Sequence, residues 1–122
     1  MRLRVLIVDD DEVFGKSLET RLAGEGRFDV VGRTTRGTDA LRLARELQPD
    51  VVLMDIAMPG MDGLTAARRL GKTCPGVRVV MLTGSDIEAD QNRAREVGAE
   101  YFRKDALDSL LAALPGRRSA LG

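Results

Sequence analysis

Histidine is absent from this chain of 122 residues, and cysteine occurs only once. Without an imidazole the chain can carry no histidine-based acid–base catalysis, no histidine metal ligand and no phosphohistidine of its own. The single cysteine, Cys74, allows no disulfide framework, so a reducing cytoplasm is the expected compartment. The N-terminal residues lead directly into a predicted strand, and no signal peptide is predicted.

An excess of either charge is also missing, since 19 basic residues balance 19 acidic ones. This balance argues against a broad basic face for direct nucleic-acid binding. No apolar run approaches the roughly 18 residues that cross a bilayer, so no membrane association is predicted. With 43% hydrophobic and 31% charged residues, the composition is that of one globular domain.

Apolar runs and helical stripes alternate along the chain. Strands are predicted over 3–8, 28–32, 51–54, 77–82 and 100–103. Helices are predicted around 14–22, 40–47, 63–70, 86–97 and 107–114. Five strands alternating with five helices predict a doubly wound α/β fold, a parallel sheet covered on both faces. The domain is expected over 1–114, and the polar segment 115–122 is interpreted as a frayed tail or the start of a linker, with Arg117 and Arg118 favouring the linker.

Chemically useful side chains follow the ends of four of these strands. They are Asp9, Asp10, Asp11, Asp55, Thr83 and Lys104. The carboxyl ends of parallel strands lie at one edge of a sheet, where doubly wound folds bind ligands. Crowded carboxylates repel one another unless a cation joins them, and carboxylates suit Mg²⁺. With a hydroxyl and an ammonium nearby, Asp55 is a candidate carboxylate nucleophile for a phosphoryl group.

Four segments in order resemble the response-regulator receiver domains of two-component signalling, over residues 3–114. They are "VLIVDDDEVF" (5–14), "PDVVLMDIAMPGMDG" (49–63), "VVMLTG" (79–84) and "GAEYFRKD" (98–105). The resemblance implies a flavodoxin-like sheet of order 2-1-3-4-5. It implies that Asp55 is the phosphoacceptor, and that Mg²⁺ is bound directly by Asp10 and Asp55. Asp9 would act through a metal-bound water, and the backbone carbonyl of Ala57 would complete the protein ligands.

The resemblance also implies the remaining roles. Thr83 would hydrogen-bond the phosphoryl group, Lys104 would pair with it, and Tyr101 would be the switch aromatic. The donor would be a sensor histidine kinase or a phosphotransfer protein. The chain would be no enzyme beyond its own phosphorylation and dephosphorylation. Its signal would be read on the face of helix 4, strand 5 and helix 5, by an output domain or a downstream protein. Homodimerisation on phosphorylation is open, through helices 1 and 5 or helices 4 and 5.

The chain departs from the family pattern at several positions. Asp105 follows Lys104 where proline is usual, a feature of receivers attached to helix-turn-helix DNA-binding domains. The segment 98–104 is one residue short, so Phe102 is a second candidate beside Tyr101. Gly84 stands where alanine is frequent, and Ala57 and Ser85 occupy positions that tune phosphoryl lifetime in the family.

Other interpretations of the same residues stay open. Residues 9–13 fit the motif of haloacid-dehalogenase-like phosphatases, with Asp9 as nucleophile and Asp11 as general acid, although Asp55 then has no role. A phosphorylation-independent interaction module is a third class, and a flavin carrier is weaker because aromatics are few. Asp11, Asp62 and Asp105 are each also interpretable as helix caps.

Overall fold

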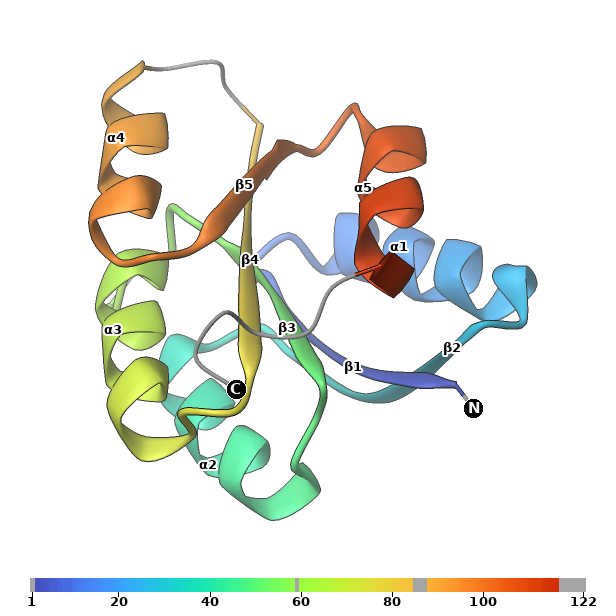
Figure 1. Ribbon diagram of the computed structural model, residues 1–122, viewed down its shortest axis with the longest axis horizontal. Helices are drawn as coiled ribbons and strands as arrows, with labels where there is room; N and C mark the ends of the chain where they lie inside the picture. Colours follow the sequence, from blue (N-terminus) through green and yellow to red (C-terminus); the bar gives the residue numbers. More distant parts are fainter. Residues whose placement is uncertain (1, 59, 85–87, 117–122) are drawn as a thin grey trace.

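The alternation of apolar runs and helical stripes yields a parallel sheet with helices on both faces (Figure 1). The computed structural model describes residues 2–58, 60–84 and 88–116. The strands are β1 (Leu3–Val8), β2 (Phe28–Thr34), β3 (Val51–Asp55), β4 (Arg78–Thr83) and β5 (Glu100–Arg103). The helices are α1 (Glu12–Glu25), α2 (Gly37–Leu47), α3 (Gly63–Thr73), α4 (Glu88–Glu96) and α5 (Leu107–Ala113), followed by the 3-10 turn η1 (Leu114–Gly116).

The sheet order is β2-β1-β3-β4-β5 and every pairing is parallel, which confirms the predicted flavodoxin-like fold. All five predicted strands and all five predicted helices are present, and the bounds that differ move by one to three residues. The predicted helix at 86–97 corresponds to α4, although residues 86 and 87 lie outside the described part of the chain. Of the predicted tail, 115 and 116 belong to η1, and 117–122, with Arg117 and Arg118, lie outside the described residues.

Two apolar layers enclose the sheet because successive strand residues point to opposite faces. In β1, Val5 and Ile7 face α1 and α5, where the buried core includes Leu18 and Leu110. The alternate residues of β1 belong to the other core cluster, with small helix residues such as Ala40, Ala66 and Ala94. In Figure 1, α1 and α5 accordingly lie on one side of the sheet and α2, α3 and α4 on the other.

Helix ends follow local capping chemistry. Asp11 caps α1, its carboxylate accepting the Phe14 N–H at 3.1 Å, and Asp62 caps α3, accepting the Thr65 N–H at 2.8 Å. Both confirm the predicted cap roles. The cap interpretation of Asp105 is wrong: the N-cap of α5 is Ala106, without a side-chain bond, and Asp105 instead pairs with Arg103.

A buried ion pair closes the amino end of the sheet. Arg78 begins β4 and is only 4% exposed. Its Nη2 donates to Glu100 Oε1 at 2.7 Å, and its Nη1 donates to the Leu114 carbonyl at 2.7 Å. A further bond of 3.2 Å reaches the Ala113 carbonyl. Arg78 therefore ties the start of β5 to the carboxyl end of α5, where the helix dipole favours a cation.

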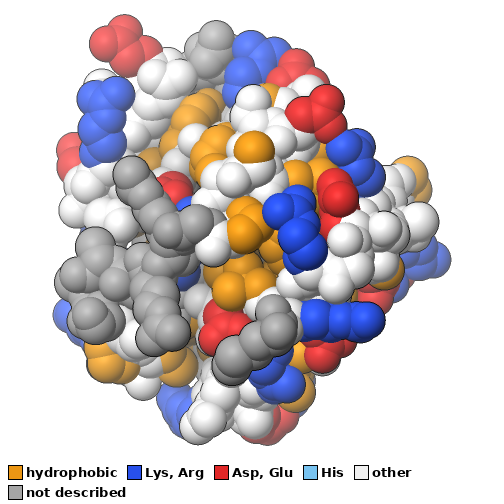
Figure 2. All heavy atoms as spheres, turned by 45° about the vertical axis from the view of Figure 1, so that its right-hand side comes forward, with side chains coloured by type: hydrophobic (Ala, Val, Ile, Leu, Met, Phe, Trp, Pro, Cys, Tyr) orange, Lys and Arg blue, Asp and Glu red, His pale blue; other side chains and the backbone are white. Residues whose placement is uncertain are grey.

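Surface charge is mixed in sign where it can be seen. On the face turned forward in Figure 2, basic and acidic side chains border a strip in which hydrophobic side chains reach the surface. Among the described residues, Val13 is the large hydrophobic side chain that is fully exposed, at 77%. No described helix combines the length and the apolar character needed to cross a bilayer.

Candidate functional site

Three aspartates meet at the carboxyl edge of the sheet. Asp9 directly follows β1, Asp10 comes next, and Asp55 is the last residue of β3. One carboxylate oxygen from each lies within 4.8 Å of those of the other two. Asp9 and Asp55 are buried, with 3% and 6% exposure, while Asp10 faces solvent. The sheet topology thus brings together acids that are 45 positions apart in the chain, as predicted.

A single ammonium group enters this cluster from β5. Lys104 Nζ lies 2.7 Å from Asp9 Oδ2 and 3.7 Å from Asp55 Oδ2. Its side chain is 18% exposed, so water screens these contacts only in part. The Lys104 backbone N–H donates to the Thr83 carbonyl at 2.8 Å, which fixes the lysine to the end of β4.

Backbone amides hold the carboxylates in place. The Asp11 N–H donates to Asp9 Oδ1 at 2.8 Å, and the Ala57 N–H donates to Asp55 Oδ1 at 3.3 Å. In each case the donor lies two residues beyond the acid, on the loop that leaves the strand. Each buried carboxylate therefore keeps one oxygen satisfied by the backbone and turns the other toward the shared pocket.

The loop after β3 approaches the Asp55 backbone closely. A Cβ on Gly63 would lie 2.1 Å from the Asp55 carbonyl oxygen and 2.8 Å from the Met81 side chain, so only glycine fits there. Gly60 adopts φ 81°, a conformation that glycine accepts without strain. The glycines of "MPGMDG" therefore let α3 begin directly behind the phosphoacceptor candidate; Pro59 lies outside the described residues.

Electrostatics at the site favour a proton on Asp55 when no cation is present. The pKa of Asp55 is raised from 3.8 to about 7, mainly by burial and further by the hydrogen bond with Asp10 and the charge of Asp9. Lys104 and the Ala57 N–H oppose the rise without cancelling it. Three acids against one ammonium leave an excess of negative charge in the pocket.

The pocket suits a hard divalent cation. Asp9 Oδ2 is buried, and the Lys104 ammonium lies 2.7 Å from it as an ion pair. This one cation does not balance the charge of three neighbouring carboxylates, so the pocket can accept a further positive charge. An all-oxygen donor set of carboxylates matches Mg²⁺ rather than a thiophilic metal.

The other predicted site residues lie at or near this edge. Thr83 is the buried last residue of β4, and Ala57 is exposed two residues beyond Asp55. Tyr101 is half-buried on β5 and packs against the α2–α3–α4 core cluster. Ser85 lies outside the described residues. Asp11 does not join the trio, because it is exposed and caps α1, which removes it from the role of general acid expected in a phosphatase.

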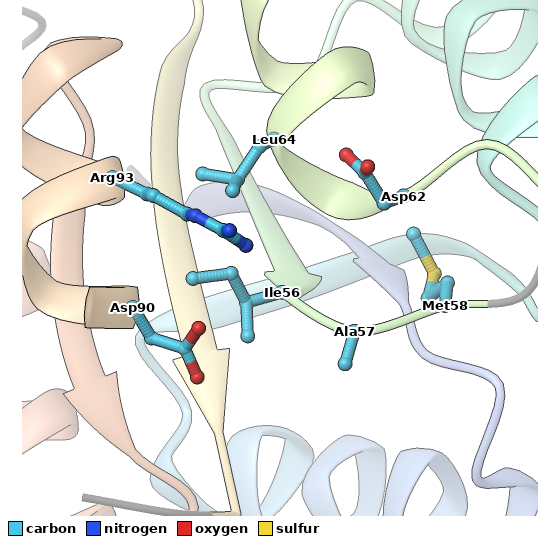
Figure 3. A pocket seen from close by; sticks show the side chains of 7 residues that line it. All are labelled: Ile56, Ala57, Met58, Asp62, Leu64, Asp90 and Arg93. Atoms are coloured by element: carbon cyan, nitrogen blue, oxygen red, sulfur yellow. The ribbon is translucent and has the colours of Figure 1, made fainter. Parts of the chain in front are cut away.

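A surface recess of about 400 Å³ opens beside the Asp55 loop (Figure 3). It is lined by Ile56, Ala57, Met58, Asp62, Leu64, Asp90 and Arg93. In Figure 3 the Arg93 side chain extends from α4 across the recess toward Ile56 and Leu64. The loop after Asp55 and helix α4 therefore line the same recess. A displacement of α4 would change the surroundings of Ala57.

One contact at the site was not anticipated from the sequence. The Lys104 ammonium lies 4.6 Å from the centroid of the Phe14 ring. Phe14 is the first residue of the helix predicted around 14–22, and its side chain packs against the α1–α5 core cluster. Its proximity to the acids, four residues beyond Asp10, is the signal that could have indicated the contact.

The fold and this edge define a flavodoxin-like α/β domain with a carboxylate pocket and a lysine at the carboxyl ends of its strands. Residues 5–114 match the response regulator receiver domain, and the chain belongs to this family. It is a receiver domain of a two-component response regulator.

Individual relatives agree with the assignment. The chain is 40% identical over 114 residues to the response regulator GacA of Pseudomonas aeruginosa, covering 92% of this chain and 53% of that protein. It is 37% identical over 102 residues to the response regulator protein VraR of Staphylococcus saprophyticus, covering 84% and 49%. The chain thus spans about half the length of the curated relatives it matches.

A solved structure gives the same fold. The signal receiver domain of NarL from Mycobacterium tuberculosis superposes with a TM-score of 0.84 at 32% identity, covering 95% of this chain and 98% of that one. The fold that carries the pocket is therefore that of a receiver domain over 95% of the chain.

Proposed function

We propose that this receiver domain accepts a phosphoryl group on Asp55 from a phosphohistidine of a sensor histidine kinase or phosphotransfer protein. The observation that carries the proposal is the convergence of Asp9, Asp10 and Asp55 on one buried pocket together with Lys104. Family membership supports the same reaction class. The site is expected to work in the cytoplasm.

Asp55 is the nucleophile in the proposed reaction. One of its carboxylate oxygens forms a bond to phosphorus while the bond from phosphorus to the donor imidazole nitrogen breaks in line. The imidazole leaves as a neutral ring after taking a proton, and Asp55 becomes an acyl phosphate. Water attack on phosphorus later returns the carboxylate and inorganic phosphate, so the chain catalyses only its own phosphorylation and dephosphorylation.

The acids would hold Mg²⁺ in a division of roles. Asp10 and Asp55 are the proposed direct carboxylate ligands, with the backbone carbonyl of Ala57 as a third protein ligand. Asp9 is proposed to act through a metal-bound water. When bound, the ion neutralises charge on phosphoryl oxygens and favours the ionised form of the nucleophile.

Two further residues would bind the oxygens of the phosphoryl group on Asp55. Lys104 already stands between Asp9 and Asp55, so a modest movement of its ammonium places it on a phosphoryl oxygen. Thr83, at the end of β4, is the proposed hydroxyl donor to another oxygen. Both would stabilise the charge that the group brings into a pocket already rich in negative charge.

The signal would be read on the α4–β5–α5 face, with Tyr101 as the proposed switch residue. The matched curated relatives are about twice as long as this chain. One similar structure is a DNA-binding response regulator of the LuxR family from Staphylococcus aureus, 25% identical with a TM-score of 0.84. An output domain of that kind, or a separate downstream protein, is the proposed reader.

Labelling with acetyl phosphate tests the proposal. Wild type should gain one phosphoryl group in a Mg²⁺-dependent manner, detected by intact mass and by gel mobility with a phosphate-binding ligand. Asp55→Asn should abolish labelling. Asp62→Asn is the matched control, because the same change on the neighbouring helix cap removes no pocket carboxylate and should leave labelling intact.

The competing functions give different results. A phosphatase centred on Asp9 would retain labelling in Asp55→Asn and lose it in Asp9→Asn. A phosphorylation-independent interaction module would take no label from any small phosphodonor, with or without Mg²⁺. Either outcome would contradict Asp55 as the phosphoacceptor.

A further inference from the structure

The ammonium of Lys104 has two kinds of neighbour. On one side lie the carboxylates of Asp9 and Asp55, at 2.7 and 3.7 Å. On another side lies the aromatic ring of Phe14, whose centroid is 4.6 Å from Nζ. This distance is well within the range over which a ring face attracts a cation, and the attraction grows when water is partly excluded, as it is around this side chain.

The ring of Phe14 is partly buried at the edge of a core cluster. Phe14 lies in the first turn of α1, and its backbone N–H bonds to the capping carboxylate of Asp11. Its side chain packs against the core cluster between α1, α5 and the sheet, a cluster that also includes Phe102 and Leu107 at its edge. A turn of the ring away from Lys104 would give up its contact with that cluster.

The carboxylates, by contrast, are shared partners. Asp55 is a proposed direct ligand of a divalent cation and Asp9 is proposed to reach it through a water, and a carboxylate engaged in this way attracts the lysine less. Lysine is a flexible chain that holds a point charge, so loss of those partners would widen its range of positions. The Phe14 ring carries no charge and is no metal ligand, so binding of a cation by the carboxylates does not compete for it.

We propose that Phe14 is a positioning residue, which keeps the Lys104 ammonium at the mouth of the acidic pocket while the carboxylates change partners. The role rests on the proposed phosphoryl transfer, in which Lys104 pairs with the incoming oxygens. Phe14 touches no reacting atom and acts through the lysine. The flanking pair of Arg103 and Asp105, with contacts of 3.0 and 2.7 Å, steadies the backbone on either side of Lys104 but does not touch its ammonium.

The test compares Phe14→Leu with Phe14→Tyr. Leucine keeps an apolar side chain in the core and removes the ring, whereas tyrosine keeps the ring face. The rate of labelling by acetyl phosphate at saturating Mg²⁺ should fall about two- to fivefold in Phe14→Leu, the loss expected for one partly exposed cation–π contact. Phe14→Tyr should restore at least half of the rate, and the Mg²⁺ dissociation constant should change less than the rate in both.

Phe28→Leu is the matched control for stability. Phe28 is buried in the same core cluster, at the start of β2, and its ring pairs with Arg27, away from the acids. This variant should lose stability to urea and keep the wild-type labelling rate. Equal slowing in Phe14→Leu and Phe28→Leu, or equal slowing in Phe14→Leu and Phe14→Tyr, would overturn the positioning role.

A second readout needs no phosphoryl transfer. In proton–carbon NMR spectra the ε-methylene protons of Lys104 should be shifted upfield by the ring in wild type and in Phe14→Tyr, and should return toward ordinary lysine values in Phe14→Leu. A shift unchanged in Phe14→Leu would overturn the contact. If wild type takes no label while the ring shift is present, the proposed function fails and the contact between Phe14 and Lys104 stands.

Discussion

Two clusters of buried charge lie at opposite ends of the same sheet. At the amino end, the Arg78 guanidinium bonds to the Glu100 carboxylate and to the carbonyls of Ala113 and Leu114. At the carboxyl end, the carboxylates of three aspartates lie together, and the ammonium of Lys104 pairs with two of them, Asp9 and Asp55. The first cluster balances a cation with one anion and a helix end; the second has acids in excess.

The difference separates a structural cluster from a functional one. A buried charge with complete partners rigidifies its surroundings, and removing any partner is costly. A cluster with surplus charge is destabilised as it stands and gains when a ligand of opposite charge arrives. The amino end is therefore expected to respond to mutation through stability, and the carboxyl end through ligand binding and pH.

The largest expected effect is at the amino end. Arg78→Met keeps the apolar stem and leaves Glu100 without its charge partner, so the free energy of unfolding should fall by about 3 kcal/mol. That is the lower end of the usual range, because Glu100 keeps 29% exposure and can recover some water. Urea denaturation measures the loss.

The control for this change is Arg68→Met, on the exposed face of α3. It should alter stability by no more than about 0.5 kcal/mol. At temperatures where Arg78→Met remains folded, acetyl phosphate labelling should match wild type. Slow labelling in the folded variant would remove the distinction between the two ends.

The second prediction concerns pH at the carboxyl end. The pKa of Asp55, faced by Asp9, Asp10 and Lys104, is raised from 3.8 to about 7 in the folded, metal-free protein. At a pH between 3.8 and about 7, Asp55 is mostly ionised in the unfolded chain and mostly protonated in the folded protein. The metal-free free energy of unfolding should therefore decrease as pH rises from about 4 to about 7, and then level off.

Asp55→Asn removes this titration, so it should flatten the dependence and make the metal-free protein more stable than wild type at pH 8. Mg²⁺ should offset part of the wild-type loss, adding about 1.4 kcal/mol at a concentration ten times its dissociation constant. Urea denaturation at pH 5.5 and pH 8, with Mg²⁺ or a chelator, measures both. Asp29→Asn, on an exposed part of β2, is the control that should keep the wild-type slope. A metal-free stability that rises toward pH 8 would contradict the raised pKa.

The sequence was informative where chemistry follows from topology. Periodicity predicts the order of strands and helices, and the carboxyl ends of parallel strands share one edge, so the sequence alone predicts that Asp9, Asp55 and Lys104 lie together. Cap roles for Asp11 and Asp62 follow from local spacing and were also predictable.

Contacts between distant side chains were not predictable in the same way. Arg78 begins a strand as an exposed arginine often does, and nothing local indicates that Glu100, 22 positions later, and the end of α5 enclose it. Asp105 was interpretable as a helix cap because its competition for Arg103 depends on the geometry of a turn. The raised pKa of Asp55 likewise depends on burial, which a sequence does not state.

The smallest expected effect lies on the surface between α1 and α5, where Arg21 pairs with Asp108. Their side chains are 45% and 92% exposed, so water and salt screen the pair. In a double-mutant cycle with Arg21→Ala and Asp108→Ala, the coupling energy from urea denaturation should be at most about 0.5 kcal/mol and should shrink in 0.5 M salt. A coupling near the cost of Arg78→Met would mean that charge pairing stabilises this domain wherever it occurs. A small coupling would mean that the amino-end cluster stabilises the fold because it is buried, and not merely because its charges are paired. The buried acids at the carboxyl end, which lack enough cations, would by the same reasoning be stabilised when a cationic ligand binds.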